Sequence, residues 1–148
     1  MKIIIIEFFM AFMAFFFFAI VYNTPKKELF FCGLFGGLGY ALYYYLSRIC
    51  GFGISANFFG ALLIAFMARI LSIYRQIPVM LYVLPSVFPL SPGANMYNAA
   101  YAIIKSDMFT AGIQTMICIK VVGVCVIAIL IILSLPEFLF KPFKKKAV

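Results

Sequence analysis

The chain has 148 residues, of which 67% are hydrophobic and only 11% are charged. A soluble domain of this length could not bury so much apolar surface, so the composition excludes a soluble globular protein and predicts one transmembrane domain over residues 1–148. The formal net charge is +8, but the basic residues lie at the ends of apolar segments. This distribution is typical of membrane topology and contact with lipid head groups, and it argues against a nucleic-acid partner.

The cysteines do not indicate a metal or redox site. The four of them follow no CxxC spacing, and the chain contains no histidine. Neither a zinc centre nor a disulfide framework is therefore expected, and no other motif in the sequence indicates a cofactor.

Five apolar stretches predict an all-α, polytopic integral membrane protein. Each is close to the roughly 20 residues needed to cross a hydrocarbon core. They cover residues 3–22, 29–47, 54–72, 77–104 and 108–135. The first lacks a small-residue cleavage site, so we expect a retained helix and not a signal peptide. Because the connections are short, consecutive helices should be antiparallel neighbours.

The second stretch is rich in small residues. Gly33, Gly37 and Ala41 follow one another at intervals of four, and Gly60 gives the third stretch a weaker version of the same pattern. Small residues at this spacing let membrane helices approach closely. We therefore expect these positions to serve helix packing, either within the chain or in a homo-oligomer or other complex.

The fourth stretch interrupts its own helix. It contains four prolines, with a serine and a glycine at the last break: Pro78, Pro85, Pro89, Pro92, Ser91 and Gly93. Freed backbone groups are tolerated at membrane depth only where they are buried in protein or line a cavity. We therefore predict two half-helices separated near mid-membrane, in preference to a single kinked helix.

The second half-helix should begin at this break, over residues 92–105, and direct its first amides into a cavity. Ser91 suits the N-cap and Pro92 the first helical position. The helix N-terminus carries a partial positive charge that would bind the carboxylate of a small solute. The residues expected to bind substrate or to act as a hinge are Pro85, Pro89, Ser91, Pro92, Gly93, Asn95 and Tyr97.

Two ionisable residues interrupt apolar stretches. Glu7 lies about five residues, or roughly 7 Å, into the first stretch, and Lys120 lies about twelve residues, or roughly 18 Å, into the last. Glu7 either reaches the interface or acts as a proton-coupling acid. Lys120 requires a buried partner, a water-filled cavity or a substrate carboxylate. A direct pair between the two requires either a tilt or a later start of the last helix, to offset their difference in depth.

The basic residues also predict the orientation. Lysines concentrate in a C-terminal tail, about residues 136–148, which places the C-terminus in the cytoplasm. With five crossings the N-terminus then lies outside. Under this assignment Lys26, Lys27 and Arg75 fall on the inner side, whereas Arg48 and Lys105 fall on the outer side.

Several motifs carry a resemblance to a known family. They are Val21-Tyr-Asn-Thr-Pro25 before the glycine-rich helix, Arg75-Gln-Ile-Pro78, and Pro85-x-x-x-Pro89-Leu-Ser-Pro-Gly93 with Tyr97. The chain resembles the threonine/serine exporter family over nearly its whole length. More narrowly, it is similar to the small subunit of the split form, the type associated with succinate export.

The resemblance implies a bacterial inner-membrane exporter of small amino or dicarboxylic acids. It also implies a larger membrane partner, which resembles the other half of the fused ten-helix transporter. It carries over no catalytic residue.

The residue inventory favours transport over catalysis. The chain has no histidine, no carboxylate pair and no nucleophile beside a base, so we predict that it is not an enzyme. Two other functions stay open: a non-transporting subunit that assembles or stabilises a membrane complex, and a passive channel.

Overall fold

The computed structural model of the chain describes residues 2–136, and every regular element in that range is a helix. The elements are α1 (Lys2–Val21), α2 (Leu29–Arg48), α3 (Ser55–Arg75), α4 (Met80–Val87), the 3₁₀ turn η1 (Phe88–Leu90), α5 (Gly93–Ile104) and α6 (Met108–Ser134). The predicted all-α, polytopic fold is confirmed. The lysines at 141 and 144–146 of the predicted basic tail lie outside the described residues.

The fourth predicted span is not one helix. Among the described residues, four helices are long and apolar enough to cross a membrane: α1, α2, α3 and α6. Between α3 and α6 the chain forms α4, η1 and α5 in succession, which confirms the predicted break at the Pro/Ser/Gly motif. Five crossings are therefore reached only if these three short elements together make one.

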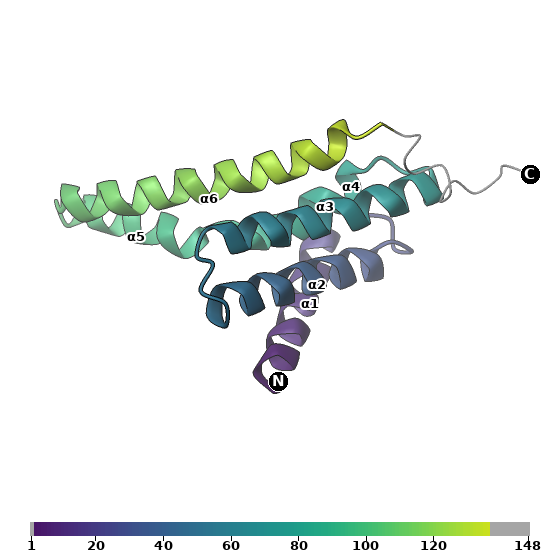
Figure 1. Cartoon of the computed structure of the whole chain (residues 1–148), viewed down its shortest axis with the longest axis horizontal. Coiled ribbons are helices and arrows are strands. Elements are labelled where there is room, and N and C mark those ends of the chain that lie inside the picture. The colour runs from purple at the N-terminus through teal and green to yellow at the C-terminus, as the bar shows by residue number, and fades with distance from the viewer. Residues whose placement is uncertain (1, 137–148) are drawn as a thin grey trace, which may run out of the picture.

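The helices form a layered arrangement around α3 (Figure 1). α2, which is paired with α1, packs on one side of α3, and α6 packs on another. The two halves of the broken segment pack on different helices. α4 contacts α1, α2 and α3, whereas α5 packs chiefly on α6. In Figure 1 the α5–α6 hairpin extends past the turn that joins α2 to α3.

One face of α2 admits α1 because it carries glycines. A Cβ atom added to Gly33 would lie 3.0 Å from the ring of Phe12, and one added to Gly36 would overlap the ring of Phe15. Phe15 is fully buried at this contact. Gly37 lies against a third phenylalanine of α1, so the glycine spacing and the aromatic spacing of the two helices match.

The adjoining face of α2 approaches α3 in the same way. A Cβ atom on Gly60 would lie 3.1 Å from the carbonyl oxygen of Gly39 and 3.2 Å from the Cβ of Tyr43. A Cβ atom on Gly39 would in turn collide with Ile64. Ala41, the third member of the predicted small-residue stripe, is half-buried. Close backbone contact therefore fixes α2 between α1 and α3.

Side chains from the α1–α2 corner compensate for a proline inside α4. Pro85 has no N–H group, so the carbonyl of Leu81 cannot receive its usual helical hydrogen bond. Thr24 Oγ1 lies 3.5 Å from that carbonyl oxygen, and Cys32 Sγ lies 3.7 Å from it. Ser86 Oγ also donates to the carbonyl of Cys32 over 3.2 Å. These contacts fix α4 to the start of α2.

The last helix has a side-chain cap. The carboxylate of Asp107 accepts a hydrogen bond of 3.1 Å from the Thr110 amide and another from the Thr110 hydroxyl. The hydroxyl contact is the main reason that the pKa of Asp107 lies below its usual value. The cap defines where the α5–α6 hairpin turns.

We predict that Gly36→Ala destabilises the chain by about 1–3 kcal/mol, because the new methyl group must displace the buried ring of Phe15. The matched control is Gly112→Ala in α6, where nothing lies within 4 Å of the new atom. That change should be neutral or stabilising by about 0.5–1 kcal/mol. Unfolding of the purified chain by a denaturing detergent gives both values, and equal values for the two variants would contradict this packing.

Candidate functional site

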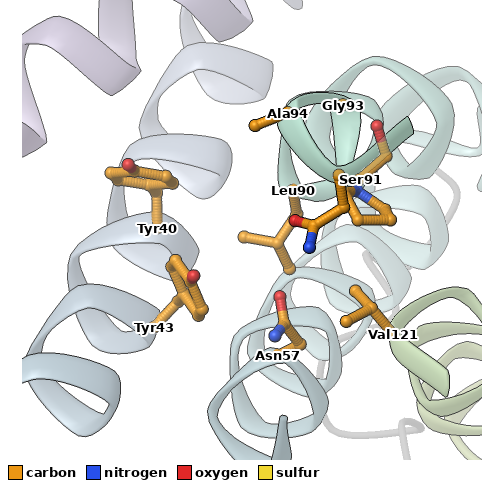
Figure 2. A pocket seen from close by; sticks show the side chains of 10 residues that line it. Tyr40, Tyr43, Asn57, Leu90, Ser91, Gly93, Ala94 and Val121 are labelled. Carbon is orange, nitrogen blue, oxygen red and sulfur yellow. The ribbon is translucent and has the colours of Figure 1, made fainter. Parts of the chain in front are cut away.

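A cavity of about 270 Å³ lies where the fourth segment breaks. Its walls come from α2, α3, the η1–α5 junction and α6. Figure 2 shows the side chains that line it. They are Tyr40, Tyr43, Asn57, Leu90, Ser91, Pro92, Gly93, Ala94, Asn95 and Val121. Four residues of the predicted site therefore meet in one cavity: Ser91, Pro92, Gly93 and Asn95.

The break itself is a tight turn between η1 and α5. Ser91 is extended, with φ −65° and ψ 152°, and its carbonyl accepts a 2.8 Å hydrogen bond from the Gly93 amide. The first bond of the new helix runs from the Met96 amide to the Pro92 carbonyl, over 3.0 Å. The N-cap is thus Pro92, with no side-chain cap. The predicted N-cap at Ser91 is wrong by one residue, because ψ 56° at Pro92 is not yet helical.

The first turn of α5 presents unpaired amides to the cavity. Within residues 2–136, the N–H groups of Ala94 and Asn95 have neither a backbone nor a side-chain acceptor, and both residues line the cavity. Such amides carry the positive end of the helix dipole. The site is therefore suited to a negatively charged or carbonyl oxygen.

The wall opposite α5 adds polar groups of both kinds. Asn57, in the first turn of α3, is buried, and its side-chain amide faces the cavity in Figure 2. That amide has no hydrogen bond to any described residue. The rings of Tyr40 and Tyr43 stand on α2 across the gap, with their centroids 5.6 Å apart. An amide that both donates and accepts can bind an ammonium or a hydroxyl group as well as a carboxylate.

Contacts with α6 fix the start of α5. Asn95 Nδ2 donates to Gln114 Oε1 over 2.9 Å, and Cys118 Sγ lies 3.9 Å from the carbonyl oxygen of Pro92. The side chain of Asn95, which lines the cavity, is thereby held by α6. The α6 helix thus orients the polar groups of the break.

The other predicted site residues lie elsewhere. Pro85 is fully buried within α4 and does not line the cavity. Tyr97 is 68% exposed on α5, where it stacks on Tyr101 with ring centroids 6.3 Å apart. The side chain of Pro89 is outside the described part of the structure.

Glu7 and Lys120 do not meet. Glu7 lines a separate cavity of about 250 Å³ between α1 and α2, and Tyr40 forms part of both this cavity and the one at the break. Lys120 is exposed on the outer side of α6 and lines an open groove there. Tyr40 therefore lies between Glu7 and the candidate site, and Lys120 lies outside the site.

The sequence model of one family matches most of the chain. It is described as Threonine/Serine exporter, ThrE, and it matches residues 7–135. The chain belongs to the threonine/serine exporter family. This confirms the family that the motifs indicated and makes the chain a multi-pass membrane protein of a transporter class. No curated protein and no solved structure is significantly similar to it.

Two tyrosines of this exporter's cavity are absent from the sequence prediction. Tyr40 and Tyr43 follow the glycine stripe directly, and glycine on the adjoining positions of α2 is what brings them beside α3. Their spacing of three residues, which places both on one face of a helix, was the available signal. No group of three metal-ligating side chains occurs among the described residues.

A second polar cluster of the exporter was also missed. Glu28 is only 2% exposed, and it accepts a 2.9 Å hydrogen bond from the Tyr82 hydroxyl and a 3.2 Å ion pair from Arg75. The Arg75 guanidinium lies 5.1 Å from the centroid of the Phe31 ring. The predicted topology could have indicated this cluster, because five alternating crossings put the segments that carry Glu28, Arg75 and Tyr82 on the same side of the membrane. The cluster joins the end of α3 and the start of α4 to the start of α2.

We predict that Tyr82→Phe lowers the free energy of unfolding by about 1–3 kcal/mol, because it leaves a buried carboxylate with one donor fewer. Tyr97→Phe is the matched control, since that tyrosine is largely exposed and its ring contact does not need the hydroxyl. Denaturing-detergent titrations of both variants measure the difference. A loss for Tyr97→Phe as large as that for Tyr82→Phe would refute a specific role for the cluster.

Proposed function

We propose that the chain is the small subunit of a two-chain exporter of small amino or dicarboxylic acids, of the threonine/serine or succinate class, in a bacterial inner membrane. It works with a larger membrane partner that resembles the other half of the fused transporter. The single observation that supports this most directly is the cavity at the break, which combines two unpaired helix amides with an unpaired asparagine side chain. Membership of an exporter family supplies the class of solute.

The proposed binding mode follows from the polarity of the cavity. The carboxylate of the solute accepts hydrogen bonds from the amides of Ala94 and Asn95, at the positive end of α5. The Asn57 side chain and the tyrosine hydroxyls of α2 bind the remaining polar groups. A volume of about 270 Å³ is slightly below the range of ~300–1,000 Å³ typical of drug-sized ligands, which suits a solute of a few heavy atoms.

Alternating access is proposed to use the break as a hinge. Since α4 is fixed to α1, α2 and α3 while α5 packs chiefly on α6, the two halves of the segment belong to different packing units. Motion between these units changes the opening of the cavity at Ser91. Glu7 supplies the proposed proton coupling, because Tyr40 separates its cavity from that of the solute. Lys120 has no part in solute binding in this proposal.

We predict that Asn57→Ala lowers the rate of solute efflux at least about tenfold, because it removes hydrogen bonds to a charged solute. The matched control is Asn98→Ala, which removes the same group from an exposed position of α5 that does not line the cavity. Efflux of labelled threonine, serine and succinate is measured from cells or from liposomes that contain the chain with its partner. Equal flux in the two variants would reject the cavity as the solute site.

The same experiment separates the exporter from the two other functions. A structural subunit should lose assembly with its partner in Asn57→Ala, whereas an exporter should lose flux while the complex remains intact. A passive channel should conduct without saturation and without dependence on a proton gradient. Measuring copurification of the partner beside the flux therefore distinguishes all three.

The proposed orientation places the α2–α3 turn outside the cell and the α1–α2 loop in the cytoplasm. The loop carries Lys26 and Lys27, in agreement with the excess of basic residues on inner surfaces. The native cysteines offer a probe for it. Among the described residues, Cys50 in the α2–α3 turn is the one exposed cysteine, while Cys32, Cys118 and Cys125 are buried.

We predict that a membrane-impermeant maleimide added to cells with a permeable outer membrane labels Cys50. Cys50→Ser should abolish the labelling. In that background, Lys26→Cys should react only after the inner membrane is opened. Labelling of Lys26→Cys in closed cells would reverse the proposed orientation.

A further inference from the structure

An open groove runs along the first half of α6. Its volume is about 480 Å³, and it is lined by apolar side chains, one glycine and one charged residue: Met108, Phe109, Gly112, Ile113, Met116, Ile117 and Lys120. Met108, Phe109 and Met116 are more than half exposed. Ile117 also packs against the cluster of Ala61 and Val121, but the other residues of this face are exposed. The buried residues Ala111 and Cys118 lie on another side of α6.

The one charge in the groove lacks a partner. Within residues 2–136 the single ion pair joins Arg75 to Glu28, and the Lys120 ammonium has no hydrogen-bond acceptor. Lys120 is twelve residues from the first residue of α6, or roughly 18 Å, and fourteen from the last, or roughly 21 Å. Apolar helix therefore extends on both sides of the ammonium.

Neither lipid nor water satisfies both parts of this groove. Acyl chains would cover the methionines and Phe109 but would leave the charged ammonium unpaired, roughly 18 Å or more from either end of α6. Water would hydrate the ammonium but would leave a continuous apolar surface exposed. A protein surface that is apolar and carries one carboxylate satisfies both at once.

Within residues 2–136, a second copy offers no carboxylate suited to this groove. A two-fold contact centred on the groove would bring two Lys120 ammonium groups together. Of the acidic residues described, Glu28 is paired with Arg75, Asp107 caps α6, and Glu7 lies in the cavity between α1 and α2. We therefore infer that the occupant is a chain of different sequence.

We propose that the groove of α6 from Met108 to Lys120 binds a transmembrane helix of a different membrane protein, and that this helix pairs an aspartate or glutamate with Lys120. The inference depends on packing and charge and not on export, so it stands or fails separately from the solute site. It assigns to Lys120 a role in assembly. The pairing also fixes how the partner helix aligns along α6, because Lys120 is the one charged residue in an otherwise apolar groove.

The test is site-specific photo-crosslinking in intact cells. A benzophenone amino acid replaces Met116, and the crosslinked peptides are identified by mass spectrometry. We expect a membrane helix of another chain that contains an acidic residue. Lys120→Glu should lower the yield of this product at least about tenfold, Lys120→Arg should retain it, and exchange of the identified acidic residue for lysine should restore it in Lys120→Glu.

Two controls keep the outcome interpretable. Lys105→Glu makes the same charge change at an exposed lysine between α5 and α6, outside the groove, and should leave the yield unchanged. If Lys120→Glu fails to accumulate, Lys120→Met keeps an unbranched side chain without the charge and should also lower the yield. Crosslinks to lipid alone, to a second copy alone or to a helix without an acidic residue would overturn the proposal, as would an unchanged yield in Lys120→Glu and Lys120→Met.

Discussion

Backbone hydrogen bonding away from water is the constraint on which the rest of this structure depends. Each proline in the fourth segment removes a donor, and the molecule responds differently at each site. At Pro85 the freed carbonyl of Leu81 is approached by side chains from the α1–α2 corner. At Ser91 and Pro92 the chain turns, and the amides of Ala94 and Asn95 stay unpaired beside a cavity. The carbonyl freed at Pro85 thus lies within reach of side-chain donors, whereas the amides that follow Pro92 have no acceptor among the described residues.

Close packing at glycines positions α2 and α3, which form the wall of the cavity opposite the break. Gly39 and Gly60 let α2 and α3 touch through their backbones, and Tyr43 and Asn57 flank that contact. A larger residue at either glycine would push α2 away from α3 and widen the cavity. The small-residue stripe and the polar cavity are thus parts of one arrangement, because close packing is what places the Asn57 amide opposite the α5 amides.

How much of this the sequence predicts depends on whether a feature is local. The break follows from proline chemistry, so its position at the Pro/Ser/Gly motif could be predicted. The N-cap register could not, because it depends on the Gly93 amide bonding to Ser91. The side of α6 that carries Lys120 is an intermediate case. Cys118 and Cys125 lie on the buried face of α6, and Lys120 lies about 200° around the helix from Cys118. The outward position of Lys120 could therefore be predicted from this angle, but not from its depth along the helix.

The unequal lengths of the helices give the cavity its place in the membrane. By helical rise α3 is roughly 31 Å long and α6 roughly 40 Å, compared with a hydrocarbon core of about 30 Å. Asn57, at the start of α3, and Val121, halfway along α6, line the same cavity, so the α5–α6 hairpin continues beyond the α2–α3 turn.

That turn follows Arg48, the last residue of α2, and contains Gly51 and Gly53, with left-handed φ values of 69° and 52°. Its irregular backbone requires water or protein around it and not acyl chains. The apolar α5–α6 hairpin beside it must instead be shielded from water. A protein that covers the hairpin would satisfy both requirements, since it would shield the apolar helices and could leave the turn in contact with water. The cavity lies beside that turn, because Asn57 at the start of α3 lines it, so a protein that covers the hairpin would also border the cavity.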